Sequence, residues 1–278
     1  MKNNFSIAII FCLAGMSFSC TQIISLDIPN SDPVLVVQGE ILSTQDSSYV
    51  QLTKTVSYYS TDVIPAVDNA SVSVLFNGNT VVFKSKGDGI YKPDSGFLGT
   101  VNTQYNLNVN YNGTNYTASS FMDPMFNIDY VDSVYEPGNG GGGGPGGGRN
   151  SSGYRVRFWW MDTRPNGKYT YIRYGHTLTD FAQDSFLRNI ILLDNSQTKL
   201  NAEISYNLGR RYQQGDTVFA VLKSCDYNMF YFLQSYRTQT SNAPGPFQTP
   251  RANLPTNISG GAIGFFAASD VRRFRKGL

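Results

Sequence analysis

Hydrophobic and polar residues alternate with a period of two in many short runs after residue 33. The strand-like pattern begins with residues 34–37, 49–52 and 71–76, and in the last of these Val72, Val74 and Phe76 alternate with Ser71 and Ser73. Successive side chains of a strand point to opposite faces, so this alternation predicts short, half-buried strands.

Turn signals separate these runs at close intervals. Asn77-Gly78, Asp88-Gly89 and Asn112-Gly113 each stand between two alternating segments. Asn-Gly and Asp-Gly accept positive φ at low cost, which suits the tight turns that join antiparallel strands. Residues 33–122 therefore predict an antiparallel β-sandwich of immunoglobulin-like size.

A second β-rich domain is expected over residues 123–278. Alternation is strict over 126–135 and strands are expected at 154–161, 169–178 and 218–222. One amphipathic helix is expected over 226–237, capped by Asp226. Its apolar stripe has members at i, i+3, i+4 and i+7, namely Met229, Phe232, Leu233 and Tyr236.

Two glycine-containing segments punctuate this half. Residues 138–152 hold a glycine-rich run, 140–148, that lacks the following helix and Gly-Lys-Ser/Thr of a phosphate loop, so a surface loop is expected. Near the C-terminus, Asn257 and Gly260-Gly261 are expected to set a turn and allow close backbone approach as residues 263–267 join a sheet.

The N-terminus has the layout of a secretory signal. Lys2 precedes an apolar run over residues 5–16, which is much shorter than the roughly 20 residues of a membrane span. The run leads into Ser17-Phe18-Ser19-Cys20, where a cysteine follows small residues. We therefore expect residues 1–19 to be a signal peptide, cut between Ser19 and Cys20.

Processing at this point has two possible routes. Cleavage by the lipoprotein peptidase requires acylation of the Cys20 thiol, and residues 20–32 then form a lipidated tether. Ser17 stands where a typical lipobox has Leu, and Ser17-Phe18-Ser19 also satisfies the rule of an ordinary signal peptidase. We favour lipidation, which predicts an acyl (palmitate-type) anchor.

Cysteine and charge counts limit the remaining classes. Cys12 leaves with the signal and Cys20 carries lipid, so Cys225 has no partner for a disulfide and the core must stabilise the fold. Loss of Lys2 changes 22 Lys and Arg to 21 against 20 Asp and Glu, a formal net charge of +1. Neither this balance nor an exported location favours nucleic acid as a partner.

Catalytic constellations are weak in this sequence. His176 is the single histidine of the chain. A Ser-His or Cys-His arrangement therefore has no second histidine to use, and a histidine-based zinc site would lack further ligands. We expect His176 to be an ordinary strand histidine whose ring is hydrogen-bonded. Glycoside hydrolysis needs two carboxylates. The nearest cluster is Asp129, Asp132 and Glu136, and alternation puts Asp129 on the opposite face from the other two, as for outward solubilising acids. We expect no enzyme activity, no metal and no cofactor.

Two surfaces remain as binding candidates. Alternation over 154–160 puts Arg155, Arg157 and Trp159 on one strand face, opposite a core set that ends with Trp160. That face can stack on a sugar or bind an anion, and cross-strand packing explains it equally well. The basic run 272–276 can meet anionic lipid or an acidic receptor patch, and a frayed solvated tail is the default expectation.

With these segments in view, the chain resembles the Bacteroidota lipoproteins of domain-of-unknown-function family 4249. The resemblance covers nearly the whole chain, with residues 140–148 as an insertion. It is carried by residues 24–29 with 34–40, by 215–218 with the helix containing Tyr231 and Ser235, and by 246–250, 255–261 and 264–266.

The resemblance implies a function class without residue roles. Members are similar in being two-part β-rich lipoproteins, often encoded beside TonB-dependent outer-membrane receptors. It implies a lipid-anchored outer-membrane protein, on the periplasmic or the surface face, that is a non-catalytic accessory or ligand-binding partner of such a receptor in nutrient uptake. The alternatives are a surface structural or adhesive module and, third, a glycan- or peptide-acting enzyme.

Substitution Cys20→Ala tests the anchor. Because one acylated thiol supplies the whole attachment, the variant should stay unprocessed or leave the membrane, and labelling with a clickable fatty acid should be lost. Equal labelling of the wild type and the variant would remove the lipoprotein assignment.

Overall fold

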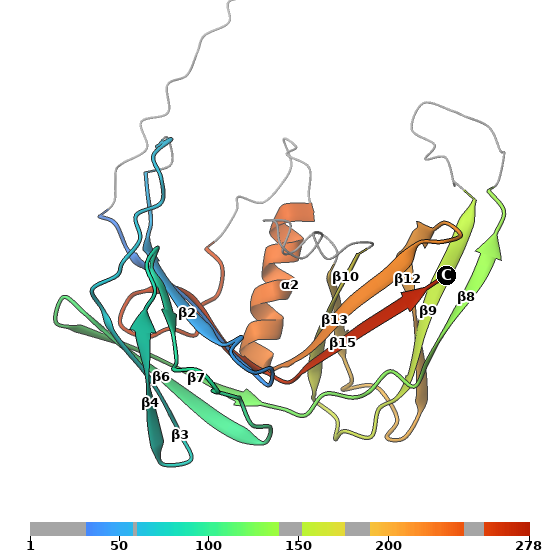
Figure 1. Cartoon of the computed structure of the whole chain (residues 1–278), viewed down its shortest axis with the longest axis horizontal. Helices are drawn as coiled ribbons and strands as arrows, with labels where there is room; N and C mark the ends of the chain where they lie inside the picture. The colour runs from blue at the N-terminus through green and yellow to red at the C-terminus, as the bar shows by residue number, and fades with distance from the viewer. Residues whose placement is uncertain (1–31, 58–59, 139–151, 176–189, 242–252) are drawn as a thin grey trace, which may run out of the picture. The chain divides into compact units, whose positions relative to one another are not determined.

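A computed structural model describes residues 32–57, 60–138, 152–175, 190–241 and 253–278. Pro33–Leu278 form one compact unit. The described residues hold fifteen strands and one helix (Figure 1), so the predicted fold class, mainly β with one helix in the second half, is confirmed. Their bounds are β1 Leu35–Leu42, β2 Tyr49–Lys54, β3 Ser71–Phe76, β4 Asn79–Ser85, β5 Ile90–Lys92, β6 Thr103–Tyr111, β7 Thr114–Met122, β8 Tyr130–Glu136, β9 Gly153–Met161, β10 Tyr169–Gly175, β11 Ile190–Asp194, β12 Glu203–Tyr212, β13 Thr217–Cys225, α2 Tyr227–Ser241, β14 Ile263–Ser269 and β15 Val271–Gly277.

The first sheet has eight strands in the order β14-β1-β2-β5-β4-β3-β6-β7. Its hairpins turn where the sequence places Asn-Gly: φ is 46° and 76° at Asn77-Gly78 and 49° and 79° at Asn112-Gly113. The two outer strands approach each other, since the Ala268 amide of β14 donates to Ser120 Oγ of β7. The sheet therefore encloses its own core, which includes Val37, Leu52, Val74, Tyr105, Leu107 and Phe266.

Two smaller sheets pack face to face in the second half. One has four strands in the order β11-β10-β13-β15 and the other three in the order β12-β9-β8. Alternation on β9 turns Val156, Phe158 and Trp160 inward, where they are buried against Ile172 and Leu222 of the four-stranded sheet. This inner set is the one that the sequence predicts.

Helix α2 begins where the sequence predicts and ends four residues later than expected. Asp226 caps it, because its Oδ1 accepts the Met229 amide at 3.0 Å. Met229 and Leu233 are buried, and they pack with Tyr171 of β10 and Phe265 of β14. The helix thus covers a seam between the four-stranded sheet and the first sheet.

The C-terminal segment joins both sheet systems. β14 pairs in parallel with β1 from Val36↔Ile263 to Leu42↔Ser269, and β15 then pairs with β13. A strand from the second half therefore completes the sheet of the first half. The expectation of a frayed tail at residues 272–276 is wrong, since they lie in β15.

Two further strands, β11 and β12, were not predicted from the sequence pattern.

Asp270 lies between these two strands and is 1 % exposed. Its Oδ1 accepts Ser43 Oγ at 2.6 Å and Arg272 Nη1 at 2.7 Å, and its Oδ2 accepts the Met125 amide at 2.9 Å. The Asp270 amide donates to Ser224 Oγ at 2.9 Å. One carboxylate therefore fixes the β1–β2 loop, the β7–β8 connection and β15 together.

A second buried contact bridges the two halves. Lys223 Nζ of β13 lies 2.9 and 2.8 Å from the two carboxylate oxygens of Glu40 on β1. Tyr171 Oη donates to Glu40 Oε1 at 2.8 Å, and burial, reinforced by Glu40, raises the pKa of this tyrosine. The Glu40 charge is thus neutralised and hydrogen-bonded, as a buried ion requires.

Among the described residues no helix is long and apolar enough to cross a membrane.

The turn before β14 is confirmed, with φ of 80° at Gly260 and 86° at Gly261. The close approach is found at Gly260, as expected, and at Gly264, but not at Gly261. A Cβ on Gly264, where φ is 115°, would lie 2.0 Å from Val37 O, and one on Gly260 would lie 2.8 Å from Asn115 O. A Cβ on Gly261 would meet nothing within 4 Å. Gly261 is therefore required for its backbone conformation alone.

Gly264→Ala should lower the free energy of unfolding by about 3 kcal/mol or more, because backbone strain adds to overlap with the β1 carbonyl. Gly261→Ala, which meets only the strain of positive φ, should cost about 1 kcal/mol. Urea unfolding of both variants measures the difference. Equal losses would mean that the β1–β14 approach does not limit the substitution.

Candidate functional site

The arginine and tryptophan face predicted from the sequence lies on the three-stranded sheet. Register places Trp159 of β9 opposite Tyr130 of β8, and Arg157 between Asp132 of β8 and Asn207 of β12. These side chains share the face that points away from the buried core. Arg155 lies further along the same strand and the same face. The sequence thus placed its three residues correctly.

Both arginines are engaged by neighbouring strands. Arg155 Nε lies 2.7 Å from Glu136 Oε1, and Arg211 Nη1 lies 2.5 Å from Glu136 Oε2. Hydrogen bonds from Arg155 hold the pKa of Glu136 below its usual value. Arg157 Nε donates to Asn207 Oδ1 at 3.1 Å and lies 3.8 Å from Asp132. An anionic ligand would have to displace these contacts.

Trp159 is held by the same cross-strand packing. Its ring stacks on Tyr130 with centroids 5.4 Å apart and planes at 12°, and the Arg157 guanidinium lies 5.2 Å from its centroid. Its indole nitrogen is buried and finds no acceptor within the described ranges. This is the arrangement expected of cross-strand pairs on a half-exposed sheet. Ligand binding by Arg155, Arg157 and Trp159 stays a prediction.

The acids considered for catalysis are distributed along this sheet. Asp132 and Glu136 share the face of the arginines and pair with them, whereas Asp129 precedes β8 and accepts the Met161 amide at 2.8 Å. No group of three His, Cys, Asp or Glu residues suited to a metal occurs in the described part of the chain. Ser19, Cys20, His176 and the glycine run 140–148 lie outside the described residues.

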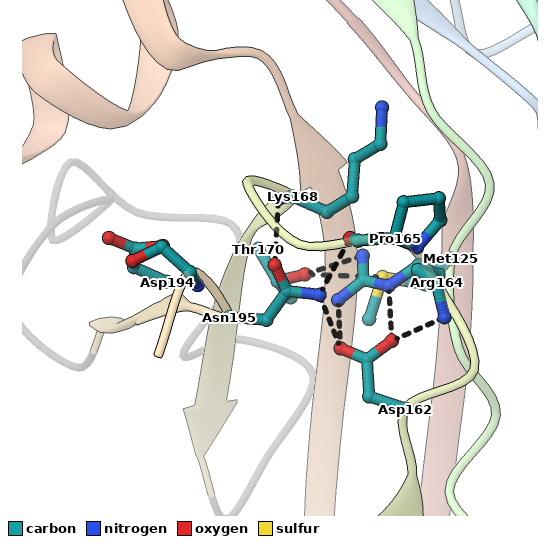
Figure 2. A network of polar contacts seen from close by, with 9 residues as sticks. Met125, Asp162, Arg164, Pro165, Lys168, Thr170, Asp194 and Asn195 are labelled. Atoms are coloured by element: carbon teal, nitrogen blue, oxygen red, sulfur yellow. Dashed lines mark hydrogen bonds and ion pairs between the residues drawn. The ribbon is translucent and has the colours of Figure 1, made fainter. Parts of the chain in front are cut away.

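A buried polar network anchors the connection between β9 and β10 (Figure 2). Arg164 and Asp162 have side chains only 6 % and 2 % exposed, and they form a two-pronged ion pair at 2.9 and 2.8 Å. Arg164 Nη1 also donates to Thr170 Oγ1 at 3.1 Å, and Asn195 Nδ2 donates to Asp162 Oδ2 at 3.3 Å. The network ties this loop to the end of β11.

Two stacked aromatic rings pack against the network. The Arg164 guanidinium lies 4.8 Å from the centroid of Phe126, and Phe126 stacks on Trp160 at 4.7 Å with planes at 6°. Burial alone raises the pKa of Asp162, but the hydrogen bonds and charge of Arg164 outweigh it, so the pKa is below its ordinary value. Because each charge has its partner, this site stabilises the fold and presents no open coordination to a ligand.

A groove of about 460 Å³ lies on the outer face of the first sheet. Its floor is formed by β3, β6 and β7, and its wall by the segment that precedes β14. Ser259 fixes that wall, since its amide donates to Thr117 O at 2.8 Å and its Oγ lies 2.6 Å from Thr117 Oγ1. The lining residues are Leu75, Asn106, Leu107, Asn108, Thr117, Ala118, Ser119, Asn257 and Ser259.

The lining of the groove contains no ionisable side chain. Asn106 and Asn108 are exposed and stand on the same face of β6, two residues apart, at about 7 Å. Asn257 is used internally: its amide and carbonyl bond to the main chain of Phe266 at 2.7 and 2.9 Å. Asparagines at 106, 108 and 110 alternate in the sequence, and this pattern indicates a polar strand face. The sequence contains no signal for the wall of the groove, because Ser259 and Thr117 are 142 positions apart.

Fold and site geometry together define a mainly β protein with one helix and several sheets. The chain belongs to the family described as Domain of unknown function (DUF4249), whose model matches residues 21–275. A comparison with proteins of curated function found no match.

Substitution Asp162→Asn should lower the free energy of unfolding at pH 7 by about 3 kcal/mol, because it leaves the Arg164 charge buried without its counter-ion. The lowered pKa also sets a pH dependence. The carboxylate stabilises the folded state above its ordinary pKa of 3.8, and this contribution is lost as pH falls through the lower folded value. The difference between wild type and variant should therefore shrink below about pH 4.

Asp94→Asn is the matched control, since Asp94 also has a lowered pKa beside Lys84 but lies in an exposed ion pair. It should change stability little. Urea unfolding from pH 2 to pH 7 measures all three proteins. Equal losses in the two variants would contradict the role of the buried network.

Proposed function

We propose that this protein is a membrane-tethered, non-catalytic binding protein that captures a neutral, hydroxyl-rich ligand for a TonB-dependent outer-membrane receptor in nutrient uptake. The signal-like N-terminus with Cys20 supports export and tethering. The resemblance of the chain to lipoproteins encoded beside such receptors supports the partner. The single observation that carries ligand binding is the uncharged groove on the first sheet.

The size of the groove suits a small ligand. A volume of about 460 Å³ falls within the usual range of roughly 300–1,000 Å³ for small-molecule sites. Its exposed apolar side chain, Leu75, lies beside amides and hydroxyls. Such a surface can contact the carbon skeleton of a ligand and hydrogen-bond its edges.

The chemistry of the lining selects a neutral ligand. A charged group would lose hydration in the groove without meeting an opposite charge, which costs free energy. The amides of Asn106 and Asn108 each donate and accept, as does the hydroxyl of Ser119. Hydroxyl groups of a sugar or polyol have the same dual character, so they match these side chains at several points.

The test is a double substitution, Asn106→Ala with Asn108→Ala, in tagged protein purified from membranes. Neutral oligosaccharides on an array identify the ligand, and calorimetry then measures its affinity. Loss of each neutral hydrogen bond costs about 0.5–1.5 kcal/mol, so the double variant should bind about 5- to 150-fold more weakly. The receptor should co-purify with both proteins, because the groove binds the ligand and not the receptor.

Asn110→Ala is the control, because Asn110 is exposed on the same strand and face but lies outside the groove. It should leave affinity unchanged. Unchanged affinity in the double variant, or binding of charged glycans alone, would contradict the ligand assignment. Purification without a TonB-dependent receptor would contradict the partner.

A further inference from the structure

Strand β15 is the outer strand of the four-stranded sheet. It pairs with β13 along seven residue pairs, from Thr217↔Gly277 to Lys223↔Val271, and the sheet order ends there. Figure 1 draws it in red alongside β13. Within the described ranges no strand pairs with its other edge. That edge presents main-chain N–H and C=O groups that a further strand can use.

Alternation divides the basic residues of β15 between two faces. Phe274 points inward and packs on Phe158 with ring centroids 5.5 Å apart. Its neighbours on that face are already engaged: Arg272 bonds to Asp270 at 2.7 Å, and Lys276 Nζ donates to Val131 O at 2.5 Å. These two cations therefore belong to the folded structure and are not available to a partner.

Arg273 and Arg275 point to the opposite face and are exposed. Neither has a carboxylate partner among the described residues. Arg275 lies with its guanidinium 5.4 Å from the ring centroid of Phe219 on β13. Two exposed arginines thus share one face of an open edge, with their Cα atoms about 7 Å apart, the spacing of alternate residues on a strand.

A third arginine lies on this face of the sheet, two strands away from β15. Register aligns Arg273 with Val221 of β13 and with Arg173 of β10. Arg173 has interactions of its own, and Glu40 acts on its charge. The positive charge that this face offers to a partner is therefore that of Arg273 and Arg275, which attracts acidic groups and repels basic ones.

The same charges exclude a second copy of this chain as the occupant. If β15 paired with another β15, arginines would face arginines across the new ladder, and like charges in opposing positions destabilise a strand pair. Charged edges of this kind prevent self-association. A strand with acidic residues at alternate positions meets the opposite situation, because each carboxylate would lie beside a guanidinium.

We propose that β15 is a docking edge that accepts an extended acidic segment of a partner protein as a fifth strand, with alternate Asp or Glu side chains beside Arg273 and Arg275. Main-chain hydrogen bonds supply the pairing and the two guanidinium groups supply the selectivity. This surface is separate from the groove on the first sheet, and its test does not depend on the ligand bound there.

The experiment measures fluorescence anisotropy with the full chain in mild nonionic detergent. The probe is a fluorescein-labelled peptide, Thr-Glu-Val-Glu-Val-Glu-Thr, which places its carboxylates on one face when extended. The peptide with Lys for Glu should not bind. A version N-methylated at alternate residues keeps the charges but loses main-chain donors, and it should bind at least tenfold more weakly.

Charge reversal by Arg273→Glu with Arg275→Glu should weaken binding of the acidic peptide at least tenfold, whereas Arg273→Lys with Arg275→Lys should stay within about threefold of wild type. Lys86→Glu with Lys92→Glu is the matched control, because it makes the same change in net charge at exposed positions of the first sheet. It should bind like wild type. Melting temperatures confirm that each variant is folded.

Four results would overturn the proposal. The first is no binding of the acidic peptide by the wild type, and the second is equal binding of its N-methylated form, which would leave only a charged patch. The third is an equal loss in the Lys86 and Lys92 control. The fourth is that charge reversal abolishes binding to phosphatidylglycerol vesicles but not to the peptide, which would assign the face to anionic lipid.

Discussion

The carboxylate of Asp270 is the interaction on which the rest of the structure depends. It lies where β14 of the first sheet ends and β15 of the four-stranded sheet begins, and it accepts hydrogen bonds from Ser43, Met125 and Arg272. A buried charge is tolerated only when it is paired and hydrogen-bonded. Because its donors come from three separate segments, those segments must all be in place at once, and the two sheet systems form one cooperative unit.

The other buried charges extend the same constraint. Glu40 and Lys223 join β1 to β13, and Asp162 and Arg164 hold the loop between β9 and β10. Such pairs add little net stability compared with apolar residues of the same shape, but removal of one partner is costly. They therefore specify which packing is allowed, while the hydrophobic clusters supply most of the free energy of folding.

We propose that ligands and partners bind at surfaces whose polar side chains are not already paired within the fold. Acids on β8 pair with the arginines beside Trp159, whereas Arg273 and Arg275 on β15 have no carboxylate partner within the part of the chain that the structure describes. The groove has polar side chains without charge. The proposed neutral ligand on the first sheet and the proposed acidic partner strand on β15 would use different chemistry and different elements, so one protein could hold both together.

The sequence by itself determined the local features. Period-two alternation predicted most strands and placed Arg155, Arg157 and Trp159 on one face, Asn-Gly pairs marked the hairpins, and Asp226 marked the start of α2. Each of these depends on residues within a few positions of one another, so the physical signal is contained in a short window. The family resemblance rests on such short motifs as well.

Only the tertiary structure decided how these pieces combine. The pairing of β14 with β1, the bonds of Asp270 to Ser43 and Met125, and the wall of the groove at Ser259 join residues that are more than a hundred positions apart. A strand signal does not say which strand is its neighbour, and a carboxylate in a sequence does not say which donors surround it. For the same reason, the sequence alone suggested that the basic run at residues 272–276 is a solvated tail. Pairing with β13 makes it an edge strand. Among the described residues, Arg272 and Lys276 have polar partners, whereas Arg273 and Arg275 have no carboxylate partner.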